Sequence, residues 1–202
     1  MKFIVVEGLD GSGKTTQVAR LKERFIQQNI PCFFTCQPSN GELGKMARAV
    51  TQGKFKIENE ALSLLFAAEH YQHFKEAIEP ALENGKHVIC DRYYYSNVAY
   101  QGVDKATIER IVSYIKAVRD ARPPDIVVYL DVEPEECIKR ISANRKEVSI
   151  YESLPLLKQQ RERYFTIFDR LKATDNVVIL DINNANEKTV SNKIWETLER
   201  IL

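Results

Sequence analysis

The sequence predicts an α/β fold, a five-stranded parallel sheet with helices on both faces. Five short runs are apolar throughout, and longer stretches with helical periodicity separate them. Strands that are apolar on both faces are typical of a parallel sheet that helices cover on both sides. A chain of 202 residues suits one compact domain with a single core, so we expect one domain over residues 1–202.

The five predicted strands are short and rich in β-branched and aromatic residues, and turn residues or charged residues bound them. The first precedes a glycine-rich turn, and the second is followed by a loop with Pro38, Asn40 and Gly41. The fourth follows the helix-breaking pair Pro123-Pro124. The predicted strands are Phe3–Val6, Pro31–Thr35, His87–Cys90, Ile126–Leu130 and Val177–Leu180.

Helical periodicity fills the intervals between these strands. In residues 15–28, Val18, Leu21 and Phe25 share one face. A second helix is expected from about Glu42, and Gly85 is a suitable stop for a long third one. Further helices are predicted between and after the last two strands. The better-defined stretches are 60–83 and 107–119.

Charge and hydropathy limit the classes of partner. Lys and Arg total 29 and Asp and Glu total 28, so the net charge of +1 argues against a broad nucleic-acid-binding surface. No segment approaches the roughly 18 apolar residues of a membrane span. The first seven residues, 1–7, are too short and too soon acidic for a secretory signal. We therefore expect a cytoplasmic protein with neither nucleic acid nor membrane as a partner.

The four cysteines are interpreted as reduced core thiols. Only Cys32 and Cys36 have a spacing close to that of metal ligands, and they lie in an apolar, strand-like stretch. Cys90 and Cys137 are isolated from them in the sequence. Free thiols are usual in a reducing cytosol, which agrees with the expected location.

A glycine-rich turn follows the first strand directly. Residues 8–15, with the sequence GLDGSGKT, fit the P-loop pattern G-x-x-x-x-G-K-[ST]. Its glycines let backbone N–H groups surround phosphate oxygens, and the next helix offers its positive N-terminus. Lys14 can reach the β- and γ-phosphates of ATP, and the Thr15 hydroxyl can ligate Mg²⁺. GTPases, motors and regulatory ATPases share the motif, so it predicts a nucleotide site without specifying a kinase.

A charged pair, Asp91-Arg92, follows the third strand. Ligands of open α/β sheets bind at the carboxyl ends of strands, so both side chains are expected to face the phosphates. The carboxylate suits Mg²⁺ or its waters, and the guanidinium suits bidentate phosphate binding. The alternative is a surface ion pair, which the P-loop on another strand of the same sheet disfavours. Thr15 and Asp91 are therefore the candidate metal ligands.

Residues 91–102, with the sequence DRYYYSNVAYQG, resemble the thymidylate kinases, whose signature is D-R-Y/H followed by S-x-x-A-Y-Q. The resemblance covers essentially the whole chain, with the motifs in the family's order and at its separations. It implies a P-loop NTPase fold with a short lid at about 140–152, ATP as donor, dTMP as acceptor, Mg²⁺ as cofactor and a homodimer. The other matching stretches are 7–17, 64–68, 80–93 and 124–132.

The resemblance also implies roles for individual residues. Phe66 would stack on the thymine ring, and Tyr100 would sit against the sugar and exclude a ribose 2′-OH. For both, plain core packing is the alternative. Asp10 would take the sugar 3′-OH or lie near the metal, and Arg92 with Arg48 would grip the acceptor phosphate. The expected dTMP-binding set is Asp10, Arg48, Phe66, His70, Arg92, Ser96, Asn97, Tyr100 and Gln101.

The expected chemistry needs alignment and charge neutralisation rather than a general base, because a monophosphate oxygen is already anionic near neutral pH. The P-loop itself contains no arginine, so in such family members the lid supplies one. By family position Arg140 would stack on adenine and Arg145 would contact the γ-phosphate. The catalytic set is Lys14, Arg92, Arg145 and Asp10. The ATP-binding set is Gly8, Asp10, Gly11, Ser12, Gly13, Lys14, Thr15, Thr16 and Arg140.

Three positions depart from the family pattern. His70 replaces an arginine that donates to the thymine O4, and Ile150 replaces a basic residue at the end of the lid. Residues 36–38 read C-Q-P where bacterial members commonly have R-E-P. These changes leave the reaction class intact, but they leave the base open, so dUMP or another pyrimidine deoxynucleotide is an alternative acceptor.

Two further functions compete with this interpretation. A deoxynucleoside kinase benefits from a carboxylate base near the end of the second strand, and Gln37 cannot serve as one. A non-catalytic nucleotide-binding regulator would not need Asp91-Arg92 together with a lid that bears arginines. The sequence thus favours a dTMP kinase over both.

Overall fold

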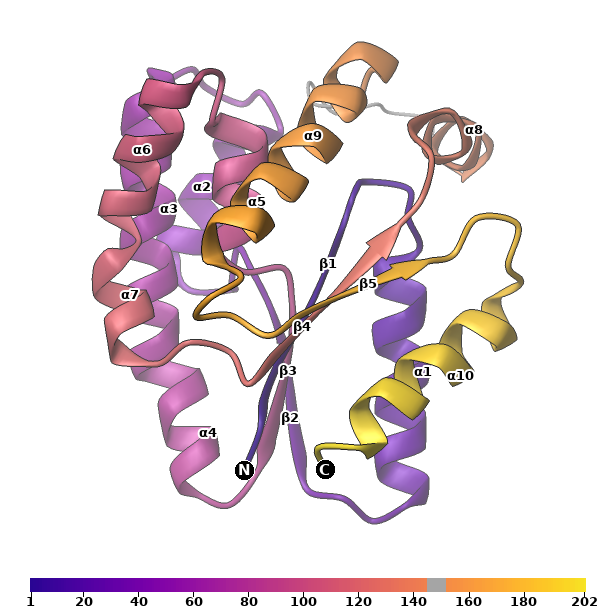
Figure 1. Ribbon diagram of the computed structural model, residues 1–202. Helices are drawn as coiled ribbons and strands as arrows, with labels where there is room; N and C mark the ends of the chain where they lie inside the picture. Colours follow the sequence, from indigo (N-terminus) through magenta and orange to yellow (C-terminus); the bar gives the residue numbers. More distant parts are fainter. Residues whose placement is uncertain (145–151) are drawn as a thin grey trace.

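The five strands form one parallel sheet in the computed structural model, which describes residues 1–144 and 152–202 (Figure 1). The strand order is β2-β3-β1-β4-β5, and every pairing is parallel. This confirms the predicted five-stranded parallel sheet, in which each strand extends by one or two residues beyond its predicted end. The strands are β1 (Phe3–Gly8), β2 (Cys32–Cys36), β3 (His87–Asp91), β4 (Ile126–Asp131) and β5 (Val177–Asp181).

Helices cover both faces of the sheet. In Figure 1, α1 and α10 lie on one side, and α3 to α7 with α9 lie on the other. No described helix has the length and apolar character that crossing a bilayer requires. The helical elements are α1 (Lys14–Gln27), α2 (Glu42–Thr51), α3 (Asn59–His73), the π-helical segment η1 (Phe74–Ile78), α4 (Glu79–Glu83), α5 (Tyr94–Gln101), α6 (Lys105–Tyr114), α7 (Lys116–Ala121), α8 (Pro134–Asn144), α9 (Leu154–Leu171) and α10 (Glu187–Glu199).

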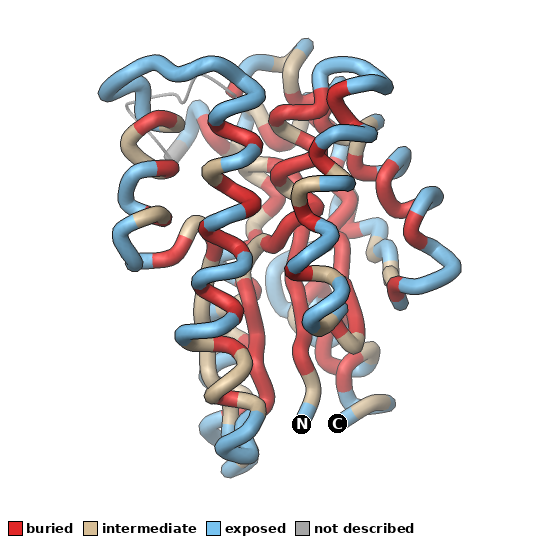
Figure 2. The backbone as a smooth tube through the Cα atoms, turned by 90° about the vertical axis from the view of Figure 1, so that its left-hand side faces the viewer, coloured by how far each residue is buried: buried red, intermediate tan, exposed pale blue. Residues whose placement is uncertain are grey.

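The core lies along the central strands, as the burial colours of Figure 2 show. Every residue of β1 and β4 is buried, while the edge strands β2 and β5 have no fully buried residue. Helices cover both faces of the central strands, and this is why their sequences are apolar throughout and do not alternate with polar residues. Two of the four cysteines, Cys90 and Cys137, are in this core; Cys32 and Cys36 are half-buried, and all four are free thiols.

The structure adds detail that the helical periodicity did not predict. The stretch 60–83 is helical throughout, but η1 interrupts it, and the stretch 107–119 is divided between α6 and α7. Helix α5 was not predicted at all. Six of its eight residues are buried, because it packs between α3 and α9. A helix that is buried nearly all round shows no apolar stripe in its sequence, which is why periodicity missed it.

Candidate active site

The site lies at the carboxyl ends of β1, β3 and β2, which are neighbours in the sheet. Val6 of β1 is in register with Asp91 of β3, and Asp91 is in register with Cys36 of β2. The loops that leave these three strands therefore start side by side. They carry the P-loop, Arg92 and Gln37, so the topology brings together three segments that are far apart in the sequence.

The P-loop adopts a conformation that its glycines permit. Gly11 and Gly13 have φ angles of +80° and +92°, which side-chain-bearing residues adopt at a cost. Gly13 is the N-cap of α1, so the helix begins directly at Lys14. A Cβ atom at Gly11 would lie 2.5 Å from the carbonyl oxygen of Cys137 in α8. The loop is therefore packed tightly between β1, α1 and α8.

A cavity of about 770 Å³ opens over this loop. Its walls include seven of the eight residues expected to bind ATP in the loop and on the adjoining helix, and also Arg140 of α8. Gly8 does not line the cavity, but its carbonyl oxygen accepts a hydrogen bond from the Lys14 Nζ at 2.8 Å. The P-loop and α8 residues in the wall are Asp10, Gly11, Ser12, Gly13, Lys14, Thr15, Thr16 and Arg140.

Thr15 and Asp91 offer oxygen atoms to a magnesium ion. The Thr15 hydroxyl lies 3.5 Å from the Asp91 Oδ2, and both residues line the P-loop cavity. The Asp91 Oδ1 is buried and has no hydrogen-bond partner among the described residues. Within residues 1–144 and 152–202, no cluster of three or more His, Cys, Asp or Glu side chains forms a cage for a metal. One or two protein oxygens beside a phosphate site are what Mg²⁺ uses when the nucleotide and water complete its shell, so the residues fit this ion.

Lys14 is the buried cation of the P-loop. Its side chain is 6% exposed, and its Nζ also donates to the carbonyl oxygen of Leu9 at 2.6 Å. Burial, together with the neighbouring Arg92, lowers the pKa of Lys14 to about 8, although Asp10 and Asp91 act in the opposite direction. In the absence of nucleotide, Lys14 thus begins to lose its proton only slightly above neutral pH.

We expect the affinity for ATP to fall as the pH rises above about 8. Lys14 is charged below this pKa and neutral above it, and only the charged amine attracts phosphate oxygens. The Kd for ATP is to be measured by calorimetry from about pH 7 to about pH 9.5. Lys14→Arg is the matched control, because a guanidinium stays charged over this range, and its Kd should not follow the same curve. A flat profile in the wild type would contradict the assignment.

Arg92 lies between the P-loop and a second cavity. Its φ is +69°, the left-handed region, which is costly for a residue with a side chain. Its Nη2 donates to the Asp10 Oδ1 at 2.6 Å, and its Nη1 lies 3.3 Å from the Gly8 carbonyl oxygen. The Nη1 also contacts the hydroxyls of Ser96 and Tyr164, at 3.1 and 3.3 Å. Asp10 and Arg92 line both cavities.

The second cavity, of about 620 Å³, collects the whole predicted dTMP-binding set. The nine residues come from the P-loop, α2, α3, the β3–α5 turn and α5, and the cavity joins them into one wall. The predicted members are Asp10, Arg48, Phe66, His70, Arg92, Ser96, Asn97, Tyr100 and Gln101. Residues that the sequence analysis did not assign to it are Gln37, Pro38, Thr51, Gln52, Lys54, Tyr93 and Glu152.

Aromatic and amide side chains form part of the cavity wall. The rings of Phe66 and His70 are stacked, with centroids 6.0 Å apart. The Asn97 Nδ2 donates to the Ser63 carbonyl oxygen at 3.0 Å, which fixes the orientation of the amide. The Asn97 Oδ1 is consequently a buried acceptor without a partner among the described residues. An acceptor in this position suits a ring N–H of a bound base.

Two of the family departures lie in the same cavity. Gln37 is 4% exposed, and neither atom of its amide has a hydrogen-bond partner in the described part of the chain. The His70 Nδ1 is 3.1 Å from the Glu69 Oε2, and its Nε2 has no such partner there. Unpaired buried polar atoms are costly, so a ligand that pairs with them gains affinity. Gln37 was not among the predicted site residues, and the structure adds it to the cavity wall.

Hydrogen bonds also hold the sugar and phosphate candidates of this cavity. The Tyr100 hydroxyl donates to the Asp10 Oδ2 at 2.9 Å, and the Arg92 guanidinium lies 5.1 Å from the centre of its ring. The guanidinium of Arg48 is held by the loop after β2, where it donates to the Pro38 carbonyl oxygen at 2.9 Å and to that of Ser39. Arg48 therefore faces the cavity from a fixed position.

The described residues include only part of the predicted lid. Arg140 lies in the last turns of α8, and its Nε donates to the Glu136 Oε1 at 2.9 Å. Arg145 and Ile150 lie outside the described residues, as does most of the predicted lid at 140–152. The role of Arg145 stays a prediction.

Comparison with known proteins agrees with a site of two cavities that share Asp10 and Arg92. The family model described as thymidylate kinase matches residues 6–194. A protein of Methanococcus aeolicus named probable thymidylate kinase is 39% identical over 202 residues, which cover 100% of this chain and 96% of the relative. Probable thymidylate kinases of Methanocaldococcus jannaschii and Pyrococcus horikoshii are 36% and 38% identical; the matches cover 98% and 82% of this chain, and 96% and 82% of the relatives. The chain belongs to the thymidylate kinase family.

Proposed function

We propose that this protein transfers the γ-phosphoryl group of ATP to dTMP, giving dTDP and ADP. The observation that carries this proposal is that the P-loop cavity and the amide-lined cavity share Asp10 and Arg92. A donor phosphate in one cavity and an acceptor phosphate in the other would meet at Arg92. In-line transfer between two bound nucleotides needs such a junction, whereas a regulator that only binds ATP does not.

The residues at this junction supply charge rather than a base. The attacking acceptor oxygen is anionic, so no proton has to be removed before it attacks the γ-phosphorus. Lys14 and Arg92 neutralise charge that spreads over the transferring phosphoryl oxygens. Thr15 and Asp91 would hold Mg²⁺, which supplies further charge neutralisation when it is bound. Asp10 orients the Arg92 guanidinium through the 2.6 Å ion pair.

The amide-lined cavity supports a thymine or uracil base rather than cytosine. The fixed Asn97 Oδ1 accepts hydrogen bonds, and thymine presents an N–H at ring position 3, whereas cytosine presents a lone pair there. The ring of Phe66 offers an apolar face beside this acceptor. Gln37 at the end of β2 replaces the carboxylate that a kinase acting on a sugar hydroxyl would use, which disfavours a deoxynucleoside kinase.

A coupled ADP-release assay tests the proposal with dTMP, dUMP, dCMP and thymidine as acceptors. We expect the highest kcat/KM for dTMP, a decrease of about tenfold for dUMP because one methyl contact is lost, and far less activity with dCMP and thymidine. Equal turnover of dTMP and dCMP would contradict the role of Asn97. ATP turnover that no acceptor stimulates would remove the kinase assignment.

We expect Tyr100→Ala to narrow the preference for dTMP over its ribonucleotide analogue. If the ring occupies the space of a 2′-OH, its removal relieves a clash, so the gain appears as a higher kcat/KM for the ribonucleotide. Tyr100→Phe keeps the ring and removes the hydroxyl that donates to Asp10, so it should retain the wild-type discrimination. Steady-state kinetics with both acceptors decide the matter, and unchanged discrimination in folded Tyr100→Ala would leave Tyr100 as a packing residue.

We also propose that the protein is a cytoplasmic homodimer that associates through α2 and α3. The four free thiols agree with a reducing compartment. Leu64 and Tyr71 are seven residues apart on α3 and are 47% and 41% exposed, and Met46 on the adjacent α2 is 50% exposed. Large apolar side chains that are exposed on two packed helices support an interface there.

Light scattering tests the dimer, and we expect Leu64→Glu to reduce the particle to a monomer because it buries a charge in the apolar contact. Ile26→Glu is the matched control, since Ile26 is 64% exposed on α1, which lies on the other side of the sheet (Figure 1). Equal behaviour of the two variants would place the interface elsewhere.

A further inference from the structure

The carboxylate of Glu7 is the most deeply placed charge near the site, and the function proposed above does not use it. Glu7 is the fifth residue of β1 and has no exposed surface. Its Oε2 is 2.8 Å from the Ser96 hydroxyl and 2.8 Å from the Tyr164 hydroxyl. Its Oε1 accepts the backbone N–H of Tyr93 at 2.8 Å. Glu7 thus accepts from three donors on the β3–α5 turn, α5 and α9.

The same two hydroxyls face Arg92 on their other side. The Arg92 Nη1 donates to the Ser96 Oγ and to the Tyr164 hydroxyl oxygen, at 3.1 and 3.3 Å. A hydroxyl has one hydrogen and two lone pairs. Because the carboxylate of Glu7 takes the hydrogen of each hydroxyl, the lone pairs of both are turned toward the guanidinium. The third contact of Glu7 fixes the peptide that follows Arg92, the residue with a φ of +69°.

We propose that Glu7 is a positioning residue for Arg92. Glu7 orients the Ser96 and Tyr164 hydroxyls so that they accept hydrogen bonds from the guanidinium, and it holds the strained backbone of Arg92 in place. A glutamine in its place presents an N–H₂ group that needs an acceptor. If this N–H₂ group takes the place of Oε2, both hydroxyls must turn their hydrogens away from it, and the guanidinium loses acceptors. If it takes the place of Oε1, it faces the Tyr93 N–H, and the contact that holds the backbone of Arg92 is lost. In either orientation the guanidinium loses its nearest buried counter-charge, although every side chain keeps its volume.

Two observations support this role over a purely structural one. The Ser96 and Tyr164 hydroxyls both contact Glu7 and Arg92, and the two hydroxyl oxygens are 2.9 Å apart. The pKa of Glu7 is raised because burial outweighs the other contributions, and Arg92 is the nearest charge that opposes this rise by favouring the ionised carboxylate. A buried carboxylate without its cation is strongly destabilising, which gives the pair a signature in stability as well as in catalysis.

The test is a double-mutant cycle on dTMP phosphorylation with Glu7→Gln and Arg92→Ala. We expect Glu7→Gln alone to lower kcat/KM for dTMP by about 10- to 100-fold. In the Arg92→Ala background the same change should cost less than about threefold, because the group it acts through is gone. If the two losses multiply, or if Glu7→Gln retains kcat/KM within about twofold of wild type, the proposal is overturned.

Thermal unfolding gives a second measurement, in which Glu7→Gln should change the Tm in opposite directions in the wild type and in Arg92→Ala. We expect Glu7→Gln to lower the Tm of the wild type and to raise the Tm of Arg92→Ala, where the carboxylate is left buried without its cation. A general packing defect would lower both. If Glu7→Gln fails to fold, Tyr164→Phe is the alternative variant, because it removes one of the two hydroxyls between Glu7 and Arg92. We expect Tyr164→Phe to lower kcat/KM by less than Glu7→Gln would, and to have no effect in the Arg92→Ala background. A loss that persists in that background counts against the proposal.

Asp175→Asn is the matched control. Asp175 is also a fully buried carboxylate, with hydroxyl partners in Tyr94 and Tyr95 and an ion pair to Arg119 at 3.2 Å. It lies just before β5, at the amino ends of the strands, and lines neither cavity. Its substitution should lower Tm in both backgrounds and leave kcat/KM unchanged. The kinetic arm rests on the proposed function, but the Tm arm does not, so failure of the one is distinguishable from failure of the other.

Discussion

Lys14→Ala is expected to lower kcat by a factor of about 10² or more. The Lys14 amine is the cation of the P-loop and lies against the carbonyl oxygens of Gly8 and Leu9, from which it can reach the transferring phosphoryl group. Removal of a single electrostatic contact of this kind from a transition state typically costs about 3 kcal/mol or more. Steady-state kinetics with saturating ATP and dTMP measure the effect.

The fold should survive this change. A buried amine whose pKa is lowered to about 8 is held there at a cost, so its removal does not take away a large stabilising contact. We expect a Tm close to that of the wild type. A well-folded Lys14→Ala enzyme with near-normal turnover would exclude the P-loop from the mechanism, and with it the assignment of the 770 Å³ cavity to ATP.

Arg92→Ala is expected to lower kcat/KM for dTMP by about 10³-fold, the largest effect among these variants. Arg92 is shared by the two cavities, so it acts on both the acceptor phosphate and the transferring group. Its loss also removes the guanidinium that is hydrogen-bonded to the hydroxyls around the buried Glu7, so the Tm should fall. Kinetics and thermal unfolding of the same preparation give both values.

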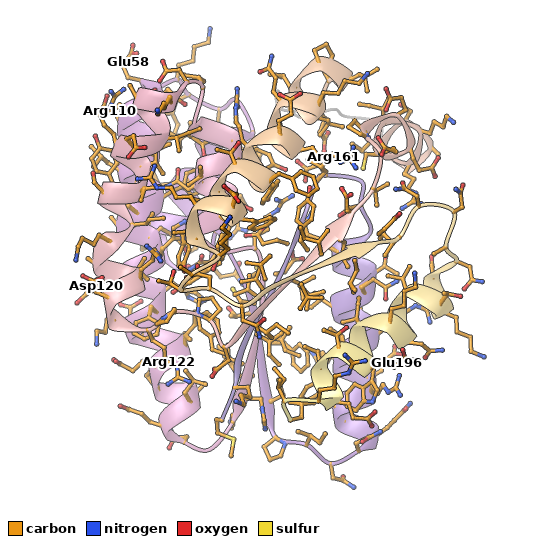
Figure 3. All side chains as sticks on the ribbon, viewed as in Figure 1. Glu58, Arg110, Asp120, Arg122, Arg161 and Glu196 are labelled. Carbon is orange, nitrogen blue, oxygen red and sulfur yellow. The ribbon has the colours of Figure 1, made fainter. Side chains whose placement is uncertain are left out.

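Arg119→Ala is the control for Arg92→Ala. Arg119 forms an ion pair with the buried Asp175, so its substitution also leaves a buried carboxylate without this ion pair. It lies on α7, which Asp120 marks in Figure 3, and lines neither cavity. We expect a lower Tm with kcat/KM retained. A comparable loss of activity in both variants would mean that Arg92 acts through stability alone.

The site was predictable from the sequence where a local motif specifies the chemistry. The P-loop needs glycines at the positive-φ positions 11 and 13, and the lysine and threonine follow at fixed offsets on the helix that begins there. Asp91 and Arg92 were predicted from the rule that ligands bind at the carboxyl ends of parallel strands. In both cases residues that act together are neighbours in the sequence or lie at strand ends that the topology aligns.

Glu7 and Tyr164 were missed because their partners are distant in the sequence. Glu7 stands in an apolar strand, and that anomaly was the one available signal of a buried, bonded carboxylate. Tyr164 belongs to α9, and its hydroxyl meets Glu7 across 157 positions of sequence. Nothing local distinguishes it from the other buried tyrosines until α9 is packed on α5.

By itself, the sequence determined the parallel α/β fold, the P-loop and the family, since apolar periodicity and short motifs are local properties of the chain. Only the tertiary structure decided that Gln37 and His70 face one cavity, that Asn97 presents an acceptor, and that Glu7 reaches Arg92 through two hydroxyls. The physical reason is that the direction of a hydrogen bond and the burial of a charge depend on which elements pack together. Those contacts form only when strands and helices from across the chain are assembled.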